Sequence, residues 1–599
     1  MLTHDPLRNV LTIDLSRRKW RVEDRSELFA EHLGGASVGI RLLDELCPAG
    51  VDPLAPENPI VLTVGPLVGL FPMASKTVAM FKSPHTGNLG ESHAGGRSAV
   101  AIRLAGYGAI VIQGASTMPV YVVIDGDGVR FRDATALWGM RSSYTVGDIL
   151  RERETGSGRR TIMRIGRAGE EGVSYATVIT ETYRHFGRLG LGAVFGSKQL
   201  KGMVVIGDRG LDVADRRAYR ETYDEIFDGA TKSEVMKKYH ELGTPMNILP
   251  LNALGALPTR NLQERRFQGA EQISGERMAE RFLGRRLACA HCPVACIHLA
   301  ALRTPHPDEP YFYKTSMLGY DYEPIYALGS MLGGDDPQGM LRLMDETEIQ
   351  GLDAMSTGVA LAWATEALER GLVSEQHTDE LPLSWGDYET YIAATGRIVT
   401  QPTDFYRALA RGVDHAASVY GGKDFALAFG GNEMPGYHTG PGAYVTYLTG
   451  ARHSHLDSAG YAVDQKAARS KAARSKAARS KAARSTESLD PREVARSLLQ
   501  EERWRQVLAS LVVCFFARGV YTSEIAQRAL ATVGCPFSDD DLRKLGADTL
   551  RRKVAFKRRA GFSYEDLQIP QRILETDSPL GLVDEGFLRR AIQHYAEDV

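Results

Sequence analysis

The sequence predicts an α+β fold, in which a glycine-rich β domain is followed by two mostly α-helical domains. The first 210 residues alternate short β-branched runs with glycine clusters, and later segments space apolar residues three and four apart. At 599 residues the chain also exceeds the roughly 250–300 residues that one hydrophobic core serves. We therefore predict domains at residues 1–210, 211–420 and 421–599.

The β domain is predicted from short apolar runs that end at turn residues. β-branched and aromatic side chains favour strands, and glycine between them favours turns. The predicted strands are Val10–Asp14, Ile60–Val64, Thr77–Phe81, Ala109–Ile112, Val120–Ile124 and Met203–Ile206.

Glycine clusters separate these strands, among them Gly95-Gly96 and Gly187-x-x-Gly190-x-Gly192. Each cluster alone indicates a tight turn, because glycine accepts positive φ angles. Several clusters in one domain also suit backbone that approaches a large polar ligand. The spacing at Gly187 differs from the dinucleotide fingerprint, and the chain has no P-loop.

Helical periodicity begins near residue 211. Apolar residues recur at helical spacing in Arg216–Phe227, Met340–Glu348, Gly358–Arg370 and Asp404–Ala417. A fourfold Lys-Ala-Ala-Arg-Ser repeat at Lys466–Ser485 forms no apolar stripe, and we interpret it as a solvated basic insertion. Asp490-Pro491 then has the cap and first-turn proline of a further helix.

Composition narrows the functional class. A formal net charge of −2 argues against bulk binding of nucleic acid. No apolar run reaches membrane-spanning length, and the first residues lack the pattern of a secretory signal. Six cysteines in 599 residues make no disulfide framework, so we expect a cytoplasmic protein.

Three cysteines, Cys289, Cys292 and Cys296, are spaced so that their thiols can converge on one inorganic group. Of the other cysteines, Cys514 lies in an apolar run that would bury its sulfur, and Cys47 and Cys535 read as ordinary cysteines. Four thiolates suit a [4Fe-4S] cluster. A zinc site that adds His291 or His298 to the three thiols is the alternative. Three close thiols that bind no metal are less favoured, because they would be liable to oxidation. We expect the triad in an irregular link between helices.

Two further stretches carry polar residues. Asp321 and Glu323 lie two residues apart, which by itself describes a solvated pair in a loop. His453 and His455 have no carboxylate or thiol partner at useful spacing, so they make a poor metal pair.

Several loops together give the chain a recognisable pattern: Gly65-Pro-Leu-Val-Gly69, Lys82-Ser-Pro-His-Thr-Gly87, Gly95-Gly96, Leu104-Ala-Gly-Tyr107, Ile165-Gly-Arg-Ala-Gly169 and Gly192-Ala-Val-Phe-Gly-Ser-Lys198. With the cysteine triad and a distant fourth cysteine, the chain resembles the tungsten-containing aldehyde ferredoxin oxidoreductase family from about Asn9 to its last helices. The resemblance implies a bis-pterin cofactor that is held by the N-terminal β domain and carries tungsten or molybdenum. It also implies one [4Fe-4S] cluster and a Mg²⁺ ion bridging the pterin phosphates.

The resemblance also assigns residues. It implies cofactor contacts at Lys76, Ser92, His93, Ala94, Gly95, Gly96, Gly187, Arg188, Gly190, Gly192, Glu348 and Asp353, and cluster ligands at Cys289, Cys292, Cys296 and Cys514. Without the resemblance, Asp353 or Ser356 reads as a helix N-cap. The chain departs from the family pattern where Lys76 replaces an arginine, Leu189 a glycine, Ala509 an aspartate and Arg342 a glutamate. Because of Arg342, we expect no additional metal at a dimer axis.

For catalysis, the resemblance implies Glu323 as the carboxylate that moves a proton beside the metal. Its neighbours Tyr322 and Ile325 predict a raised pKa, which suits general acid–base work. His453, with His455 as the alternate, would polarise a carbonyl. Tyr322 would contact a substrate oxygen, and Tyr437 would line the pocket, although His438-Thr-Gly follows it where the family has Asp-Pro-Arg.

The implied reaction is oxidation of an aldehyde to a carboxylic acid, with electrons passing through the cluster to ferredoxin or a ferredoxin-like iron–sulfur subunit. A homo- or hetero-oligomer is expected. Two alternatives remain: low-potential reduction of a carboxylic acid or an aromatic thioester with the same cofactors, and a non-catalytic iron–sulfur electron-transfer subunit with a degenerate pterin site.

Overall fold

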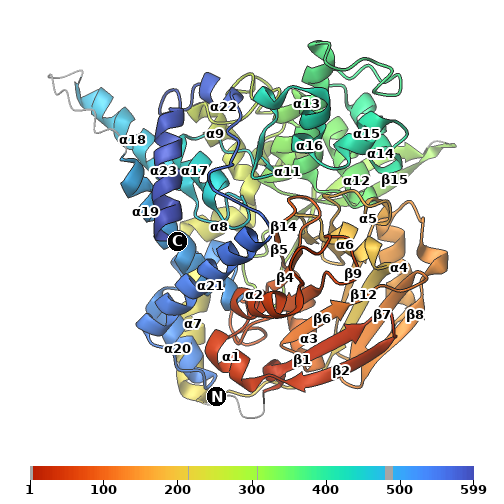
Figure 1. The fold of residues 1–599 in the computed structure, drawn as a ribbon, viewed down its shortest axis with the longest axis vertical. Coiled ribbons are helices and arrows are strands. Elements are labelled where there is room, and N and C mark those ends of the chain that lie inside the picture. The colour runs from red at the N-terminus through yellow and green to blue at the C-terminus, as the bar shows by residue number, and fades with distance from the viewer. Residues whose placement is uncertain (1–4, 214, 307, 479–489) are drawn as a thin grey trace.

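The N-terminal region folds into two six-stranded sheets that pack around shared helices in the computed structural model (Figure 1), which describes residues 5–213, 215–306, 308–478 and 490–599. The first sheet has the order β2-β1-β6-β3-β4-β5 and the second β11-β10-β9-β12-β7-β8. All six predicted strands are confirmed. The strands are β1 Asn9–Asp14, β2 Lys19–Asp24, β3 Ile60–Thr63, β4 Thr77–Lys82, β5 Leu89–Ala94, β6 Ala109–Gln113, β7 Val120–Asp125, β8 Gly128–Asp133, β9 Arg159–Ile165, β10 Val178–Thr180, β11 His185–Phe186 and β12 Leu200–Gly207.

The two sheets have the same topology. Reversed, the second order reads β8-β7-β12-β9-β10-β11, which is the first order with six added to each strand number. The pairings correspond too: β1 with β6 and β7 with β12 are parallel, and the remaining neighbours are antiparallel. The N-terminal region is therefore a topological duplication.

Helices cover and join the sheets. Strand β12, the last strand of the second sheet in chain order, packs on α3. A Cβ on Gly207 would lie 2.2 Å from the Ala105 backbone nitrogen, so only glycine allows this approach. The helices of this region are α1 Ser26–His32, α2 Gly35–Leu46, α3 Ser98–Ala105, α4 Ser143–Arg153, α5 Arg167–Glu170 and α6 Leu191–Ser197.

The rest of the chain is mostly helical, as predicted, but it also holds a three-stranded antiparallel sheet. Its strands are β13 Leu283–Leu287, β14 Ile297–His306 and β15 Glu309–Tyr320, and a small pair is formed by β16 Ala428–Phe429 and β17 Asn432–Glu433. The cysteine triad lies between β13 and β14, so the expectation of a link between helices is wrong. Backbone pairing such as Leu287 with Ile297 closes the cysteine loop at its base.

The predicted helices are present. The pattern over Asp404–Ala417 is divided into two helices at Gly412, whose φ is +97°. The helices are α7 Arg216–Lys232, α8 Glu234–Glu241, α9 Ile248–Leu254, α10 Gly275–Arg281, α11 Tyr322–Leu328, α12 Pro337–Gln350, α13 Ala354–Glu369, α14 Tyr388–Thr400, α15 Asp404–Leu409, α16 Val413–Tyr420, α17 Pro441–Thr449, α18 Gly460–Ala478, α19 Pro491–Ser510, α20 Ser523–Thr532, α21 Asp539–Arg559, α22 Arg572–Glu575 and α23 Glu585–Asp598. Short 3-10 turns lie at Pro6–Arg8, Thr135–Leu137, Thr244–Asn247, Ser330–Leu332, Lys423–Phe425 and Phe515–Gly519.

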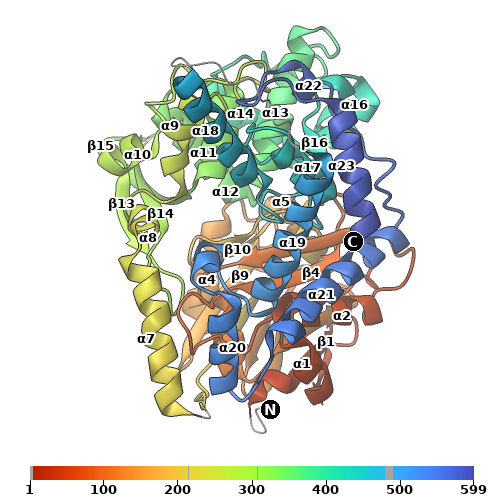
Figure 2. The same cartoon turned by 90° about the vertical axis from the view of Figure 1, so that its left-hand side faces the viewer.

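C-terminal helices return to the N-terminal sheets. Figure 2 shows α19 and α21 running down to α1 and α2, and both contact α2. Asp490 caps α19 by accepting from the Arg492 N–H at 3.0 Å. The end of α19 packs on the first residue of α2, Gly35, where a Cβ would lie 2.1 Å from the Ala509 carbonyl oxygen. This contact brings the segment that carries Cys514 to the N-terminal region.

The start of the basic repeat continues α18, which extends from the body in Figure 1. Lys466, Arg469 and Ser470 are exposed, as expected for a solvated insertion. Residues 479–489 of the repeat and the following segment lie outside the described residues. Among the helices that the structure describes, none has both the length and the apolar character needed to cross a membrane.

Candidate active site

The two sheets meet along β5 and β11, which contact each other. Each strand is followed by a glycine loop and then by a helix: Gly95-Gly96 leads into α3, and Gly187 to Gly190 leads into α6. The loops hold equivalent positions in the duplicated topology. The fold therefore places two matching glycine loops side by side at one seam.

The positions at this seam require or favour glycine for different physical reasons. Gly190 and Gly192 allow close backbone packing, because a Cβ would lie 2.0 Å from the Ser174 carbonyl oxygen and 2.5 Å from that of Thr177. Gly96 has φ +95° and a Cβ there would be 2.0 Å from the Thr182 hydroxyl. At Gly187 a Cβ would meet only the His185 Cβ, at 3.8 Å. Gly187 thus borders open space, as a ligand-facing glycine would.

The cysteine loop is attached to the first glycine loop. The Gly96 N–H donates to the Cys289 sulfur at 3.1 Å, and the Ala290 N–H donates to the Gly96 carbonyl at 2.8 Å. A Cβ on Gly95 would lie 2.8 Å from the same sulfur. Only glycine lets the Cys289 sulfur come this close.

Met73 joins the fourth cysteine to the triad. Its N–H donates to the His291 carbonyl at 3.0 Å, and its carbonyl accepts from the Cys514 N–H at 2.9 Å. Burial raises the pKa of Cys292 to about 12, and the charges of Cys289 and Cys514 add to the rise. The thiols thus lie close enough to affect one another's ionisation.

Lys76 lies beside these thiols. Burial lowers its pKa, but the charges of Cys514, Cys289 and Cys296 together outweigh burial and leave the pKa raised. Across the residues that the structure describes, no three His, Cys, Asp or Glu side chains converge tightly enough for a single metal ion.

Glu323 lies at the centre of a second group. It occupies the first turn of α11, and its Oε1 is 3.1 Å from both the His455 Nε2 and the Tyr437 hydroxyl, which donates to it. Tyr437 also stacks on Tyr461, with ring centroids 4.7 Å apart. The His455 Nδ1 is buried and has no hydrogen-bond partner within the described chain. Aromatic packing therefore holds Glu323 and His455 against each other.

The expected rise in the Glu323 pKa is wrong. Burial alone would raise it, but the hydrogen bond and the charge of His455, with the bond from Tyr437, lower the pKa below its ordinary value. Glu323 is thus an anion at neutral pH, suited to accept a proton.

His453 does not join this group. Its Nδ1 is bonded to the Tyr447 carbonyl at 2.8 Å and its Nε2 to the Lys557 ammonium at 2.8 Å. The ring packs on Gly430, where a Cβ would lie 2.3 Å from it. Both nitrogens are used inside the C-terminal region, so the structure brings the alternate histidine, His455, to Glu323.

Tyr322 is fully buried, and its hydroxyl donates to the Gly436 carbonyl rather than standing free for a substrate. Its ring contacts Tyr437, with centroids 4.8 Å apart. Tyr322 therefore positions the neighbouring tyrosine.

Ser92, His93 and Ala94 end strand β5, directly before Gly95. His93 bonds Glu91 at 2.7 Å and faces Phe515, next to Cys514. Burial lowers the pKa of His93 to about 4. It is thus a neutral side chain between the first glycine loop and the thiols.

Three side-chain pairs, each with one carboxylate, connect the second glycine loop to the helical region. They are Arg184 with Asp321 at 2.5 Å, His185 with Glu348 at 2.7 Å, and Arg188 with Asp353 at 3.1 Å. Asp353 also caps α13 by accepting from the Met355 N–H, so the expected N-cap is confirmed. The carboxylates expected to bind a pterin lie at this interface.

Sequence reasoning missed Glu433, which is fully buried and joins three parts of the chain. It accepts from His85 at 2.8 Å, from Ser356 at 2.6 Å and from the Val413 N–H at 3.1 Å. Burial raises its pKa, but His85, together with Arg188 and Ser356, outweighs burial and brings the pKa to about 2. Arg188 donates to its carbonyl and keeps a buried, unpartnered Nη1. No local motif marks Glu433, because its partners are distant in sequence.

Ser510, which follows Ala509 where the family pattern has an aspartate, bonds within the helical packing. Its hydroxyl donates to the Gln506 carbonyl at 2.7 Å and accepts from the Ser37 N–H at 3.2 Å. It fastens α19 to α2.

Comparison with known proteins gives a consistent result. Residues 10–207 match the model of the aldehyde ferredoxin oxidoreductase N-terminal domain, and residues 221–596 match that of domains 2 and 3. A tungsten-containing aldehyde ferredoxin oxidoreductase of Thermococcus kodakarensis is 30% identical over 95% of this chain and 92% of its own. An aliphatic sulfonate oxidoreductase, WOR-like subunit, of Pyrococcus furiosus is 30% identical over 68% of this chain and 66% of its own. The active-site complex BamBC of benzoyl coenzyme A reductase shares the fold, with a TM-score of 0.82 and 20% identity over 99% of this chain and 94% of its own.

Proposed function

This chain belongs to the aldehyde ferredoxin oxidoreductase family, and from that premise we propose that it oxidises an aldehyde to a carboxylic acid. The proposed cofactors are a bis-pterin tungsten or molybdenum centre, with Mg²⁺ bridging its phosphates, and one [4Fe-4S] cluster. The proposed electron acceptor is ferredoxin or a ferredoxin-like subunit. We further propose that the protein works as an oligomer in the cytoplasm.

The pair of equivalent glycine loops beside four thiols carries this proposal. A ligand with two similar halves needs two similar binding loops, and the duplicated sheets supply them at one seam. The residues also fit such a ligand: Gly187 borders open space, and Arg188 keeps a buried N–H donor without a partner that an anionic group can accept from. Glu348 and Asp353 supply acceptors for ring N–H groups beside the second loop.

The cluster ligands would be Cys289, Cys292, Cys296 and Cys514. Gly95 and Gly96 hold the Cys289 sulfur against the seam, which places the thiols next to the first glycine loop. Lys76 offsets part of the negative charge of the thiolates.

A bound bis-pterin metal centre would supply two-electron redox chemistry. The protein would supply proton transfer. Conversion of an aldehyde and water to a carboxylic acid releases two electrons and two protons, so a base is required. Glu323, ionised at neutral pH, would take a proton, and His455 would exchange it through Nε2. With Nε2 donating to Glu323, the Nδ1 of His455 would accept a hydrogen bond from the water that reacts with the aldehyde.

Elemental analysis and a dye-coupled assay test the proposal. Anaerobically purified protein should contain about four irons and one tungsten or molybdenum per chain. It should also reduce a viologen dye when aldehydes are added. Iron without tungsten or molybdenum would refute the enzyme proposal in favour of an electron-transfer subunit. Turnover only in the reducing direction, with a carboxylic acid or an aromatic thioester, would refute aldehyde oxidation.

A further inference from the structure

A cleft of about 700 Å³ lies beside the cysteine loop and is lined by five arginines. They are Arg97, Arg151, Arg159, Arg160 and Arg285. One carboxylate, Glu181, also lines the cleft, and its Oε2 accepts from the Thr161 hydroxyl and the Ile162 N–H. The cleft is strongly cationic, although the whole chain has a formal net charge of −2.

Most of this positive charge is not neutralised. In the described part of the chain, Arg97, Arg159 and Arg285 form no ion pair, and Arg160 donates to two backbone carbonyls. Arg151 pairs with Asp148 at 3.3 Å, where both side chains are at least half exposed and the pair is worth little. Unpaired guanidinium groups of this kind attract carboxylates on another molecule.

The cleft borders the proposed cluster site. Arg97 directly follows Gly96, whose N–H contacts the Cys289 sulfur. Leu287, on the cleft wall, lies two residues before that cysteine. Ala288 and His291 of the cysteine loop are exposed, and the three cysteines of the triad are partly exposed. A carrier held over the cleft would therefore lie against the edge of the protein where electrons leave.

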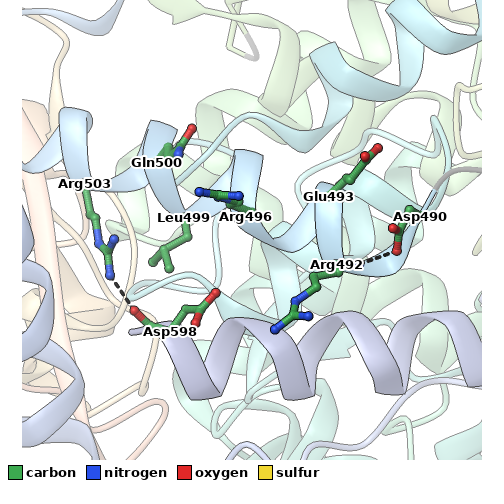
Figure 3. Close-up of a pocket in the computed structure, with 8 residues that line it drawn as sticks. All are labelled: Asp490, Arg492, Glu493, Arg496, Leu499, Gln500, Arg503 and Asp598. Carbon is green, nitrogen blue, oxygen red and sulfur yellow. Dashed lines mark hydrogen bonds between the residues drawn. The ribbon is translucent and has the colours of Figure 1, made fainter.

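A second groove shows that arginines alone do not give this charge. Figure 3 shows Arg492, Arg496 and Arg503 between α19 and α23, with Asp490, Glu493 and Asp598 among them. Three carboxylates balance three guanidinium groups there. This groove has no preference for an acidic partner, and it provides a matched control.

We infer that the arginine cleft is the docking surface for an acidic one-electron iron–sulfur protein. The inference rests on the proposed function, because it identifies the face at which the proposed acceptor binds. The arginines are exposed or half-buried and come from separate segments, which suits a protein surface better than an enclosed small-anion pocket. Oxidation of one aldehyde releases two electrons and therefore reduces two carrier molecules in turn.

The test compares the double variant R159E/R285E with the native holoenzyme. Aldehyde-dependent reduction of a purified acidic [4Fe-4S] ferredoxin should lose roughly tenfold or more in kcat/KM at low salt, and its salt dependence should flatten. Reduction of benzyl viologen should not fall. R492E/R496E makes the same change of charge in the Figure 3 groove and should leave both assays unchanged. Ferredoxin turnover that equals the native value at low salt would overturn the inference.

Calorimetric titration with the oxidised ferredoxin separates docking from the proposed function, because it requires no turnover. Native protein should bind the ferredoxin, and R159E/R285E should bind it at least tenfold more weakly. If the double variant bound ferredoxin more weakly but the native protein oxidised no aldehyde, the proposed function would be refuted and the docking surface would be supported. Equal binding by both proteins would overturn the docking surface. The docking surface would also be overturned if the native protein bound pyrophosphate and the double variant lost only that binding while it kept ferredoxin binding. Such a result would identify a small-anion site.

Discussion

The strongest prediction separates His455 from His453. In H455Q the amide can still donate to Glu323, but it cannot exchange a proton. Proton transfer by a positioned side chain contributes about 10²–10⁴-fold. We therefore expect kcat to fall by that factor, about 2.7–5.5 kcal/mol of activation free energy, while Tm stays unchanged.

H453Q should behave in the opposite way. It disturbs bonds of 2.8 Å to the Tyr447 carbonyl and to the buried Lys557 ammonium. One neutral and one charged hydrogen bond together contribute about 2–4 kcal/mol. We therefore expect a lower Tm and a kcat near the native value. G430A, which would place a Cβ 2.3 Å from the His453 ring, should destabilise the protein without loss of turnover.

The assays are dye-coupled turnover under anaerobic conditions and thermal unfolding followed by circular dichroism, with metal content measured for every variant. If H453Q lost turnover at native Tm while H455Q stayed active, the reasoning from contacts would be refuted. A loss of metal in H455Q would show that His455 serves to retain the cofactor.

Three further predictions concern protons and the cluster. E323Q should lose at least about 100-fold in kcat while it keeps its metals. In the native enzyme, kcat should start to fall only below pH 4.5, because the pKa of Glu323 is lowered from its ordinary value of 4.5. A fall in kcat that begins above pH 4.5 would contradict this. C514S should contain fewer than four irons per chain by elemental analysis, whereas C535S should keep the native iron content; native iron in C514S would exclude it as a ligand. Burial lowers the pKa of His438 to about 4, so the unfolded chain binds its proton first and stability falls as the pH drops from 6.5 towards 4. H438Q should lose about 2 kcal/mol less stability than the native protein between pH 7 and pH 5, and equal losses of Tm would contradict the assigned pKa.

Local patterns predicted the strands, the helices and the set of cysteines. Alternation and helical spacing are properties of neighbouring residues, so the six strands and helices such as α7 and α12 could be found. The equivalence of the two sheets could not be found, because it lies in the order of pairing and not in repeated residues. The β13–β15 sheet was missed because β13 carries Arg285 and Arg286, whose exposed side chains hide the strand pattern.

The candidate active site likewise has features that local sequence predicts and features that depend on tertiary packing. Spacing could propose His453 or His455, but only tertiary packing shows which of them faces Glu323. The pKa of Glu323 also depends on partners more than 100 residues away. Glu433 and the pairs of Arg184 and His185 escaped notice for the same reason.

The two matching glycine loops have acquired unlike neighbours. The first loop contacts the cysteines through Gly96, and the second reaches the carboxylates of the helical region through Arg188. The two halves of the domain, which share one topology, therefore differ in the parts of the chain that they contact. The first half contacts the cysteine loop, and the second half contacts the helical region that carries Glu323. One topology, present twice, therefore contacts two different parts of the protein.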